Sequence, residues 1–176
     1  LASGLPERFY VLGEGSNTLF VEDEAPYIIK PRIKGIQIKE DEYGFKLVVG
    51  ASENWHDLVR YCLSNNMYGL ENLALIPGSV GAAPVQNIGA YGVEFSRFCK
   101  SVEWFNFEAK RTLNLSNREC GFQYRGSNFK KALKNKGVIT HVNLYLPKAW
   151  QPVLDYGGLS ELSSDVSAQE VMAKVI

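Results

Sequence analysis

The sequence predicts an α+β fold, and three features of the chain support this class. Short runs rich in β-branched and aromatic residues recur along it, as they do in strands. One stretch near residue 55 instead has the apolar periodicity of a helix. Two glycine-rich segments separate these elements and suit neither a helix nor a strand. The chain is therefore expected to alternate strands, helices and glycine-rich loops.

The first half of the chain is predicted to hold several strands and one helix. The strands are expected at residues 9–12, 27–29, 33–38 and 45–49. Ser52 is a candidate N-cap for the helix, and Asn65 and Asn66 follow its end. The apolar face of the helix is a single stripe: Trp55, Leu58, Val59, Cys62 and Leu63. His56 lies off this stripe, which favours a surface histidine over a catalytic base.

The second half of the chain is predicted to continue the same alternation. Strands are expected at residues 101–107, 111–115 and 138–146, with a short helical turn at 117–120. Ser167 and Glu170 form a capping box that opens an amphipathic helix. Its apolar side consists of Ala168, Val171, Met172, Val175 and Ile176. No stop signal follows, and the chain begins at Leu1 rather than at a methionine, so we expect a fragment.

The most distinctive segment of the chain is residues 77–92, which contain four glycines and two prolines. Such a backbone turns repeatedly, and its N–H groups are not screened by bulky side chains. This composition suits close approach to a large anionic ligand. The alternative is a buried Gly/Ala-rich connection between core strands.

A second glycine-rich loop, residues 13–17, favours a ligand-binding role for residues 77–92 over a buried connection between core strands. It follows a predicted strand and begins like the dinucleotide fingerprint G-x-G-x-x-G, but Thr18 stands at the third glycine position. Residues 19–21 are β-prone, so no helix offers its N-terminus to a pyrophosphate. Ser16 and Asn17 beside two glycines instead resemble an anion-binding nest of backbone amides. Two such loops imply one extended ligand that bears phosphate.

Composition and charge exclude several classes of protein. The 176 residues are 45% hydrophobic, enough for a real core. The 19 basic and 19 acidic residues give zero net charge, which argues against nucleic-acid binding and against attraction to a membrane surface. No stretch is long and apolar enough for a membrane span. Three cysteines without a C-x-x-C pair argue against disulfides and zinc and favour a reducing cytoplasm; they are Cys62, Cys99 and Cys120.

Five motifs stand in order along the chain: Gly-Glu-Gly-Ser-Asn at 13–17, residues 71–81, Gln-Asn-Ile-Gly-Ala-Tyr-Gly at 86–92, the Tyr-Arg of 122–125, and residues 150–154. Together they resemble the UDP-N-acetylenolpyruvoylglucosamine reductase (MurB) family. The resemblance implies an FAD-binding fold of the vanillyl-alcohol-oxidase (PCMH) type with two lobes, incomplete at both ends. On this basis residues 1–70 complete the first lobe and residues 71–162 form the second. Residues 163–176 begin a truncated helix that leads to an absent substrate-binding domain.

The resemblance also implies a reaction. NADPH reduces FAD, and the reduced flavin then reduces an enolpyruvyl ether on a UDP-sugar, which yields UDP-N-acetylmuramate for peptidoglycan synthesis. Such an enzyme is expected in the cytoplasm, as a monomer at full length, without nucleic-acid or membrane partners and without a metal.

Roles for individual residues follow from the motif positions. Arg125 stands where the family has its active-site arginine, and its planar fork suits the substrate carboxylate; a surface salt bridge is the alternative. Tyr124 and Tyr156 are expected to contact substrate, with Tyr156 in the tyrosine-bearing loop of one subclass, unless it only packs on its own lobe. The residues expected at the cofactor are Gly13, Glu14, Gly15, Ser16, Asn17, Pro77, Gly78, Ser79, Val80, Gly81, Ala82, Gln86, Asn87, Gly89, Ala90, Tyr91, Gly92 and Ile139.

Two family motifs do not occur in this sequence: the one with the proton-donating serine and the one with the catalytic glutamate. The chain alone is therefore not expected to turn over substrate. Two other functions stay open. In the first, the chain is a non-catalytic scaffold that has kept the fold and lost the flavin. In the second, it belongs to a different flavin oxidase of the same fold. The oxidase is disfavoured because no histidine or cysteine for covalent flavin attachment stands near residues 13–17.

Overall fold

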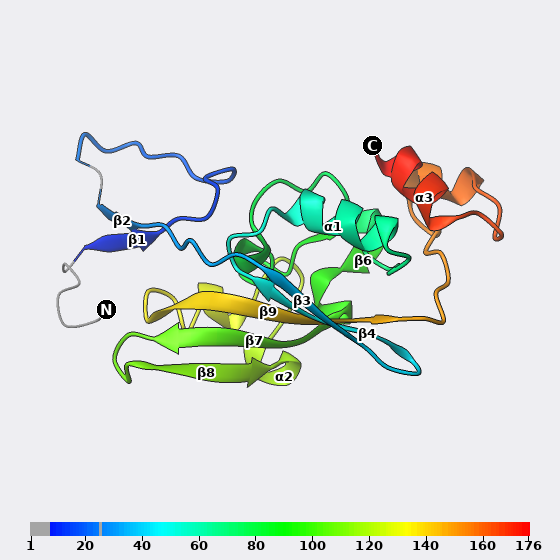
Figure 1. Cartoon of the computed structure of the whole chain (residues 1–176). Coiled ribbons are helices and arrows are strands. Elements are labelled where there is room, and N and C mark those ends of the chain that lie inside the picture. Colours follow the sequence, from blue (N-terminus) through cyan, green and yellow to red (C-terminus); the bar gives the residue numbers. More distant parts are fainter. Residues whose placement is uncertain (1–7, 25) are drawn as a thin grey trace.

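The computed structural model of the chain describes residues 8–24 and 26–176 (Figure 1). It has the expected α+β composition. Its centre is a five-stranded antiparallel sheet in the order β3-β4-β9-β7-β8. The strands are β3 (Ile36–Glu40), β4 (Gly44–Gly50), β7 (Cys99–Asn106), β8 (Arg111–Ser116) and β9 (Gly137–Pro147). A separate parallel pair is formed by β1 (Phe9–Val11) and β2 (Tyr27–Ile29).

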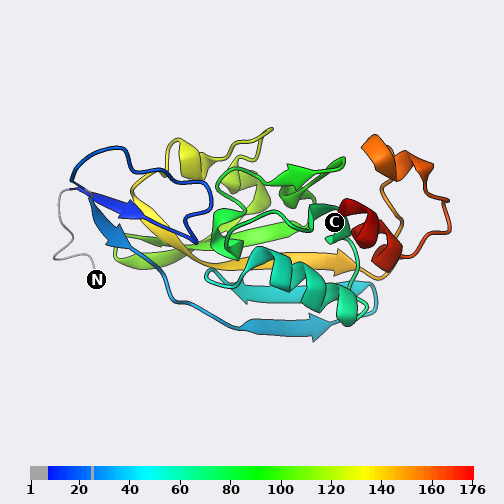
Figure 2. The ribbon, with the colours of Figure 1, turned by 90° about the horizontal axis from the view of Figure 1, so that it is seen from above.

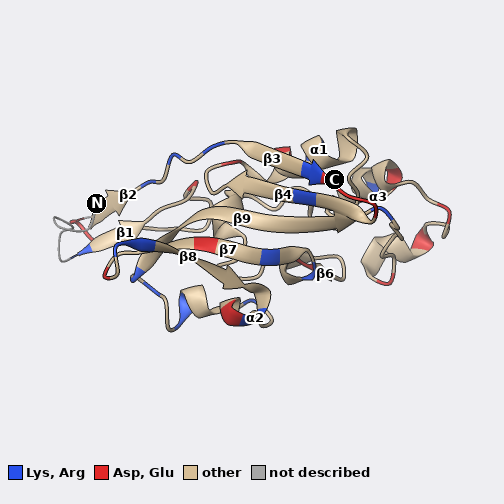
Figure 3. Cartoon of the chain, turned by 60° about the horizontal axis from the view of Figure 1, so that its bottom comes forward, with Lys and Arg blue, Asp and Glu red and all other residues tan. Residues whose placement is uncertain are grey.

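One face of the sheet is covered, and the helix α1 (Trp55–Ser64) lies across it (Figure 2). Strand β4 shows the alternation that this requires, because Leu47 and Val49 are buried while Lys46 points to solvent. Lys100 and Glu103 line the same surface as Lys46 on the opposite face. Figure 3 shows that charged positions recur along the strands of the sheet. The core of the chain therefore lies between the sheet and α1, on one side only.

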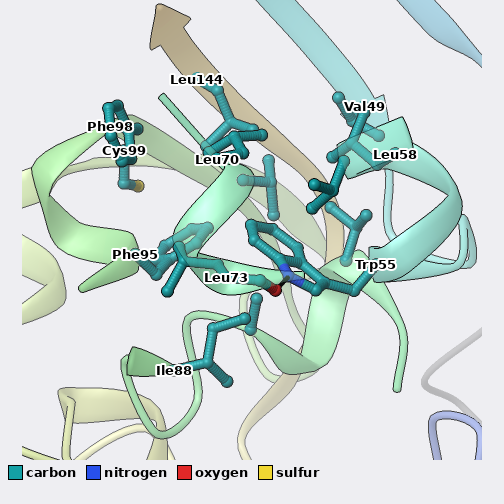
Figure 4. Close-up of a cluster of buried hydrophobic side chains, with 14 of the residues drawn as sticks. Val49, Trp55, Leu58, Leu70, Leu73, Ile88, Phe95, Phe98, Cys99 and Leu144 are labelled. Atoms are coloured by element: carbon teal, nitrogen blue, oxygen red, sulfur yellow. Dashed lines mark hydrogen bonds between the residues drawn. The ribbon is translucent and has the colours of Figure 1, made fainter. Parts of the chain in front are cut away.

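Trp55 anchors this core at the start of α1. Its indole Nε1–H donates to the Leu73 carbonyl at 2.8 Å, and its ring packs edge-on against Phe95 at 5.9 Å (Figure 4). The five residues of the predicted apolar stripe of α1 are all buried. The predicted N-cap is wrong, because Asn54 caps the helix and accepts from the Asp57 N–H at 3.0 Å. The Ser52 hydroxyl is engaged elsewhere: it donates to the Pro31 carbonyl.

The predicted strands are present, with two corrections. The strand expected at residues 33–38 begins only at Ile36, because Gly35 adopts a φ of +112° and breaks the extended run. Residues 19–21 form no strand, and Leu19 is 84% exposed. The other strands agree with the prediction to within two residues.

The helices of the second half also follow the sequence. The turn at α2 (Asn117–Cys120) and the helix α3 (Ala168–Val175) both begin with a capping box. Ala168, Val171 and Val175 are buried, as predicted. Ile176 is not part of that apolar face, since it lies past the last turn of α3 and is 63% exposed.

Short elements connect the sheet to the helices. Strands β5 (Gly89–Ala90) and β6 (Val93–Glu94) form a small hairpin. The 3₁₀ turns are η1 (Glu71–Leu73), η2 (Val80–Ala82), η3 (Phe95–Arg97), η4 (Asn128–Lys130) and η5 (Gly157–Glu161).

The central sheet takes strands from both of the predicted lobes. Strand β4 pairs with β9 from Gly44 to Gly50, so a boundary after residue 70 falls inside one sheet. The chain passes from the β1–β2 pair to the central sheet earlier, between Ile29 at the end of β2 and Ile36 at the start of β3. Hydrogen bonding along β4 and β9 makes residues 36–50 part of the same unit as residues 99–147.

Candidate functional site

The two glycine-rich loops line one cavity of about 480 Å³. Its lining comes from the segment after β1 and from the loop that contains η2. These two segments lie toward the β1–β2 end of the molecule (Figure 2). Twelve of the predicted cofactor residues line it: Gly13, Glu14, Gly15, Ser16, Asn17, Pro77, Gly78, Ser79, Gly81, Ala82, Gln86 and Ile139. Residues far apart in the sequence thus form one site.

The loops fit together through bare backbone on one side and hydroxyls on the other. A Cβ on Gly13 would lie 3.0 Å from Ser79 Oγ, and a Cβ on Gly78 would lie 3.2 Å from Ser16 Oγ. Gly78 also has a φ of +121°, which favours glycine. The close approach of the two loops therefore depends on glycine in each.

Several backbone amides of the two loops have no protein acceptor. Within the described part of the chain, the N–H groups of residues 13–17, Gly78 and Ser79 make no hydrogen bond. Not all of the second loop is free, because the Val80 N–H donates to Glu53 and the Gly81 N–H to Ala51. The available donors thus belong mainly to residues 13–17. Successive free amides beside a cavity suit an anion as their acceptor.

Glu14 fixes the first loop to the start of α1. Both of its carboxylate oxygens accept from Asn54 Nδ2, at 3.1 and 3.0 Å. The same Asn54 caps α1 through its Oδ1. Glu14 therefore holds the loop in place, and its carboxylate points to Asn54.

The cavity also has a basic rim and an apolar wall that the sequence did not predict. Lys30, Lys130 and Lys134 line it together with the half-buried or buried Trp104, Phe129 and Leu133. The density of lysines between Gly126 and Gly137 is the one signal in the sequence that could have located the rim. Lys30 gave no such signal, because only the pairing of β1 with β2 brings it to the site.

Six of the predicted cofactor residues do not line the cavity. Val80 is fully buried in the core. Asn87 is buried too, and its side chain is used up within the protein: it donates to Glu94 and to the Gln123 carbonyl, and accepts from Ser96. The remaining four form strand β5 and the turn that joins it to β6: Gly89, Ala90, Tyr91 and Gly92.

Tyr124 and Arg125 form the tip of a tight turn outside the cavity. The Gln123 and Gly126 backbones exchange two hydrogen bonds of 3.0 Å across it. Arg125 has a φ of +52°, is exposed, and has its guanidinium 5.9 Å from the ring of Tyr124. The chain continues from this turn into Phe129 and Lys130 of the cavity wall. Arg125 forms no ion pair with the described residues, so the salt-bridge alternative has no support there.

Tyr156 lies beside the β5–β6 turn, away from the cavity lining. Its ring packs edge-on against Tyr91 at 6.2 Å, and 58% of the residue is exposed. His56 is partly buried, and its Nδ1 accepts the Leu75 N–H at 3.1 Å, which gives it a structural contact. Tyr156 and Arg125 thus both project from turns near the second glycine-rich loop.

The cysteines are free and buried, and burial raises the pKa of Cys62 to about 12. Among the residues that the structure describes, no group of His, Cys, Asp and Glu side chains has the arrangement of a metal site. No helix in the same residues has the length and apolar character needed to cross a membrane.

The fold and the site together define a flavin-binding class of protein. The FAD binding domain family matches residues 2–109, more than half of the chain, and the chain belongs to this family. Its resemblance to one group of reductases, predicted from the five motifs, is confirmed by the curated relatives. The chain is 56% identical over 168 residues to UDP-N-acetylenolpyruvoylglucosamine reductase of Pseudoalteromonas translucida (strain TAC 125), covering 96% of the chain and 50% of the relative.

Two further comparisons agree. The enzyme of the same name from Salmonella typhimurium is 53% identical over 173 residues, which cover 98% of the chain and 50% of that relative. The crystal structure of UDP-N-acetylenolpyruvylglucosamine reductase (MurB) from Thermus caldophilus superimposes with a TM-score of 0.65 and 26% identity, covering 96% of the chain and 54% of that structure. The chain spans about half the length of the curated relatives it matches.

Proposed function

We propose that the chain is the FAD-binding portion of an NADPH-dependent reductase that converts UDP-N-acetylglucosamine enolpyruvate to UDP-N-acetylmuramate in peptidoglycan precursor synthesis. The observation that carries this proposal is the meeting of residues 13–17 with Gly78 and Ser79 around one cavity. The names of the curated relatives support the choice of reaction. A cytoplasmic location and a monomeric full-length enzyme are part of the same proposal.

The lining of the cavity fits FAD in three respects. The free amides of residues 13–17 suit phosphate oxygens. Lys30, Lys130 and Lys134 would offset the negative charge of a pyrophosphate. The wall that contains Trp104 and Ile139 offers apolar surface to a flat ring system. When bound, FAD would supply hydride transfer, with NADPH as the donor that reduces it.

Arg125 is proposed as the residue that holds the substrate carboxylate. Its guanidinium can form two parallel hydrogen bonds to a carboxylate, and charge that develops beside that carboxylate would be stabilised. Its φ of +52° is an unfavourable conformation for a residue with a side chain. Strain of this kind is found at functional sites, which supports the role.

Tyr124 and Tyr156 are proposed to contact the UDP-sugar. Tyr124 is 83% exposed and Tyr156 is 58% exposed, so both rings are available to stack on a ligand. Because the motifs with the proton-donating serine and the catalytic glutamate do not occur in these 176 residues, we propose that the chain alone binds FAD without turnover.

A spectroscopic titration tests the proposal. The purified chain is expected to show flavin absorbance, or to acquire it and quench flavin fluorescence when FAD is added. A folded sample that binds no FAD would favour the scaffold alternative. In a version extended to the full length of the relatives, the reduced flavin is expected to be reoxidised by the UDP-sugar enolpyruvyl ether. Reoxidation by other substrates only would favour a different flavin oxidase.

A further inference from the structure

Two neighbouring buried side chains of η1, Glu71 and Asn72, contact a distant part of the chain. Glu71 is 3% exposed and Asn72 is 1% exposed. Neither lines the cavity of the proposed FAD site. Both reach the connection between β9 and η5, about 80 residues further on, which carries Tyr156 at its end. Their burial is therefore not explained by the cofactor.

Glu71 holds the beginning of that connection. Its carboxylate accepts the Trp150 indole Nε1–H at 2.6 Å and the Gly69 N–H at 2.7 Å. The ring of Trp150 also packs edge-on against Tyr68 at 5.6 Å. The hydrogen bond and the aromatic contact together fix the Trp150 side chain.

Asn72 holds the middle of the connection. Its Nδ2 donates to the Val153 carbonyl at 2.9 Å and to the Tyr91 carbonyl at 3.0 Å. A flipped amide would place Oδ1 against both carbonyls, so the pair of acceptors fixes the orientation of the amide. The bond to Val153 is the only hydrogen bond that residues 151–155 make with the part of the chain described here.

The same amide thus joins the Tyr156 segment to the β5–β6 turn. Tyr91 and Gly92 are the two central residues of that turn, and both have positive φ, +46° and +78°, as in type I′ hairpins. A Cβ on Gly92 would lie 3.5 Å from Val153 Cγ1 and 3.6 Å from Tyr156 Cβ. The turn and the segment are therefore joined by the Asn72 amide and lie close to each other at Gly92.

We propose that Glu71 and Asn72 are positioning residues that clamp residues 150–153 and thereby set the place of Tyr156 beside Tyr91. The part of this inference that concerns substrate rests on the proposed function, because Tyr156 is assigned to the UDP-sugar there. The clamp itself rests only on contacts within the chain.

NMR relaxation tests the clamp directly. Asn72→Asp keeps the volume of the side chain but removes the donor and places a carboxylate against two carbonyls. Backbone order parameters in residues 150–156 are expected to fall from about 0.85 to below about 0.6, while those of β7 and β9 stay unchanged. Asn117→Asp is the matched control, since Asn117 Nδ2 also joins two carbonyls, of Ser96 and Cys99. It should lower order parameters near those residues and leave 150–156 unchanged.

A second variant keeps the test decisive if Asn72→Asp does not fold. Trp150→Phe removes the indole donor and keeps a smaller aromatic ring at a half-buried position. It is expected to lower the order parameters of residues 150–153 in the same direction, because Glu71 then loses its contact with the segment. Unchanged order parameters in whichever variant folds overturn the clamp. Failure of the unmodified chain to bind FAD would instead refute the proposed function and leave the clamp standing.

The effect of the clamp on substrate binding is tested by steady-state kinetics of a protein extended to the full length of the relatives. Asn72→Asp is expected to raise KM for the UDP-sugar enolpyruvyl ether about tenfold, with kcat and the rate of flavin reduction by NADPH nearly unchanged. A merely destabilising change would lower the amount of active enzyme and therefore kcat, with KM unaltered. An unaltered KM in a variant whose segment has become mobile overturns the link from the clamp to substrate.

Discussion

Gly13 and Ser79 touch where the two glycine-rich loops meet, since a Cβ on Gly13 would lie 3.0 Å from Ser79 Oγ. Gly78 and Ser16 repeat the contact in the opposite sense at 3.2 Å. Each loop thus offers one glycine to a serine of the other. The cavity keeps its shape only while both of these contacts stay free of additional side-chain atoms.

Gly13→Ala should therefore weaken FAD binding. The new methyl group would push Ser79 aside and separate the loops, and we expect an affinity loss of about tenfold, near 1.4 kcal/mol. Flavin fluorescence titration measures it. Ser79→Ala removes the obstructing hydroxyl, so the double variant Gly13→Ala/Ser79→Ala should bind better than the sum of the single effects predicts. Strictly additive losses would contradict a steric contact between these residues.

Gly78→Ala should destabilise the fold as well as the site. Its φ of +121° suits glycine alone, and we expect a loss of about 1–3 kcal/mol in the free energy of unfolding, measured with urea. Gly35→Ala is the control, because Gly35 has a similar φ of +112° and its new methyl group would meet nothing within 4 Å beyond its chain neighbours. It should lose stability by the same mechanism but keep FAD affinity. Equal FAD affinity in both variants would argue against the role of Gly78.

The order of elements could be predicted because local pattern dominates there. The α1 stripe and the capping box of α3 depend only on residues close in sequence, and both are present. The N-cap of α1 was missed because the Ser52 hydroxyl is drawn to Pro31, 21 residues earlier, which leaves Asn54 as the cap. The pairing of β4 with β9 could not be predicted, because strand pairing leaves no local mark in the sequence.

The site was predicted less evenly. Glycine-rich composition located both loops, and Ile139, which was also expected at the cofactor, lines the same cavity. Composition could not tell which residues of 77–92 face the ligand, so Val80 and Asn87 were placed at the cavity although both are buried elsewhere. The place of Lys30 at the cavity and the bonds of Asn72 arise from contacts across the fold, for which neither spacing nor composition gives a signal.

Lys134→Gln tests the basic rim. Removing one charge from the cavity should weaken FAD binding by about three- to tenfold and make the affinity less sensitive to salt. Lys131→Gln is a neighbouring control, since Lys131 does not line the cavity and its Nζ donates to Gln123 Oε1 at 2.8 Å. FAD titrations at low and high ionic strength compare the two. Equal behaviour of both variants would remove Lys134 from the site.

The buried thiols predict a loss of stability at alkaline pH. Burial raises the pKa of Cys62 to about 12, whereas an unfolded thiol titrates near 9.0. Between these values the folded state keeps a proton that the unfolded state releases, so the stability from this thiol declines as pH rises above 9. We expect about 1 kcal/mol between pH 8 and 10.

Urea unfolding of the chain and of Cys62→Ala at both pH values isolates this thiol, because all other groups titrate alike in the two proteins. The variant should be less stable throughout, since it leaves a cavity, but its stability should fall less steeply with pH. Parallel pH dependence in the two proteins would mean that Cys62 is not shielded from solvent in the folded chain.

Arg125 allows strain and function to be separated. Arg125→Gly and Arg125→Ala both remove the guanidinium, but only glycine relieves the positive φ of +52°. The glycine variant should be more stable than the alanine variant by about 1 kcal/mol in urea unfolding.

Because Arg125 does not line the cavity, both variants should bind FAD like the unmodified chain. At the full length of the relatives, both should slow flavin reoxidation by the UDP-sugar at least about a hundredfold, as expected for loss of a charge at the developing anion. If the flavin of the glycine variant were reoxidised as quickly as that of the unmodified enzyme, Arg125 would be a strained turn residue with no part in the reaction.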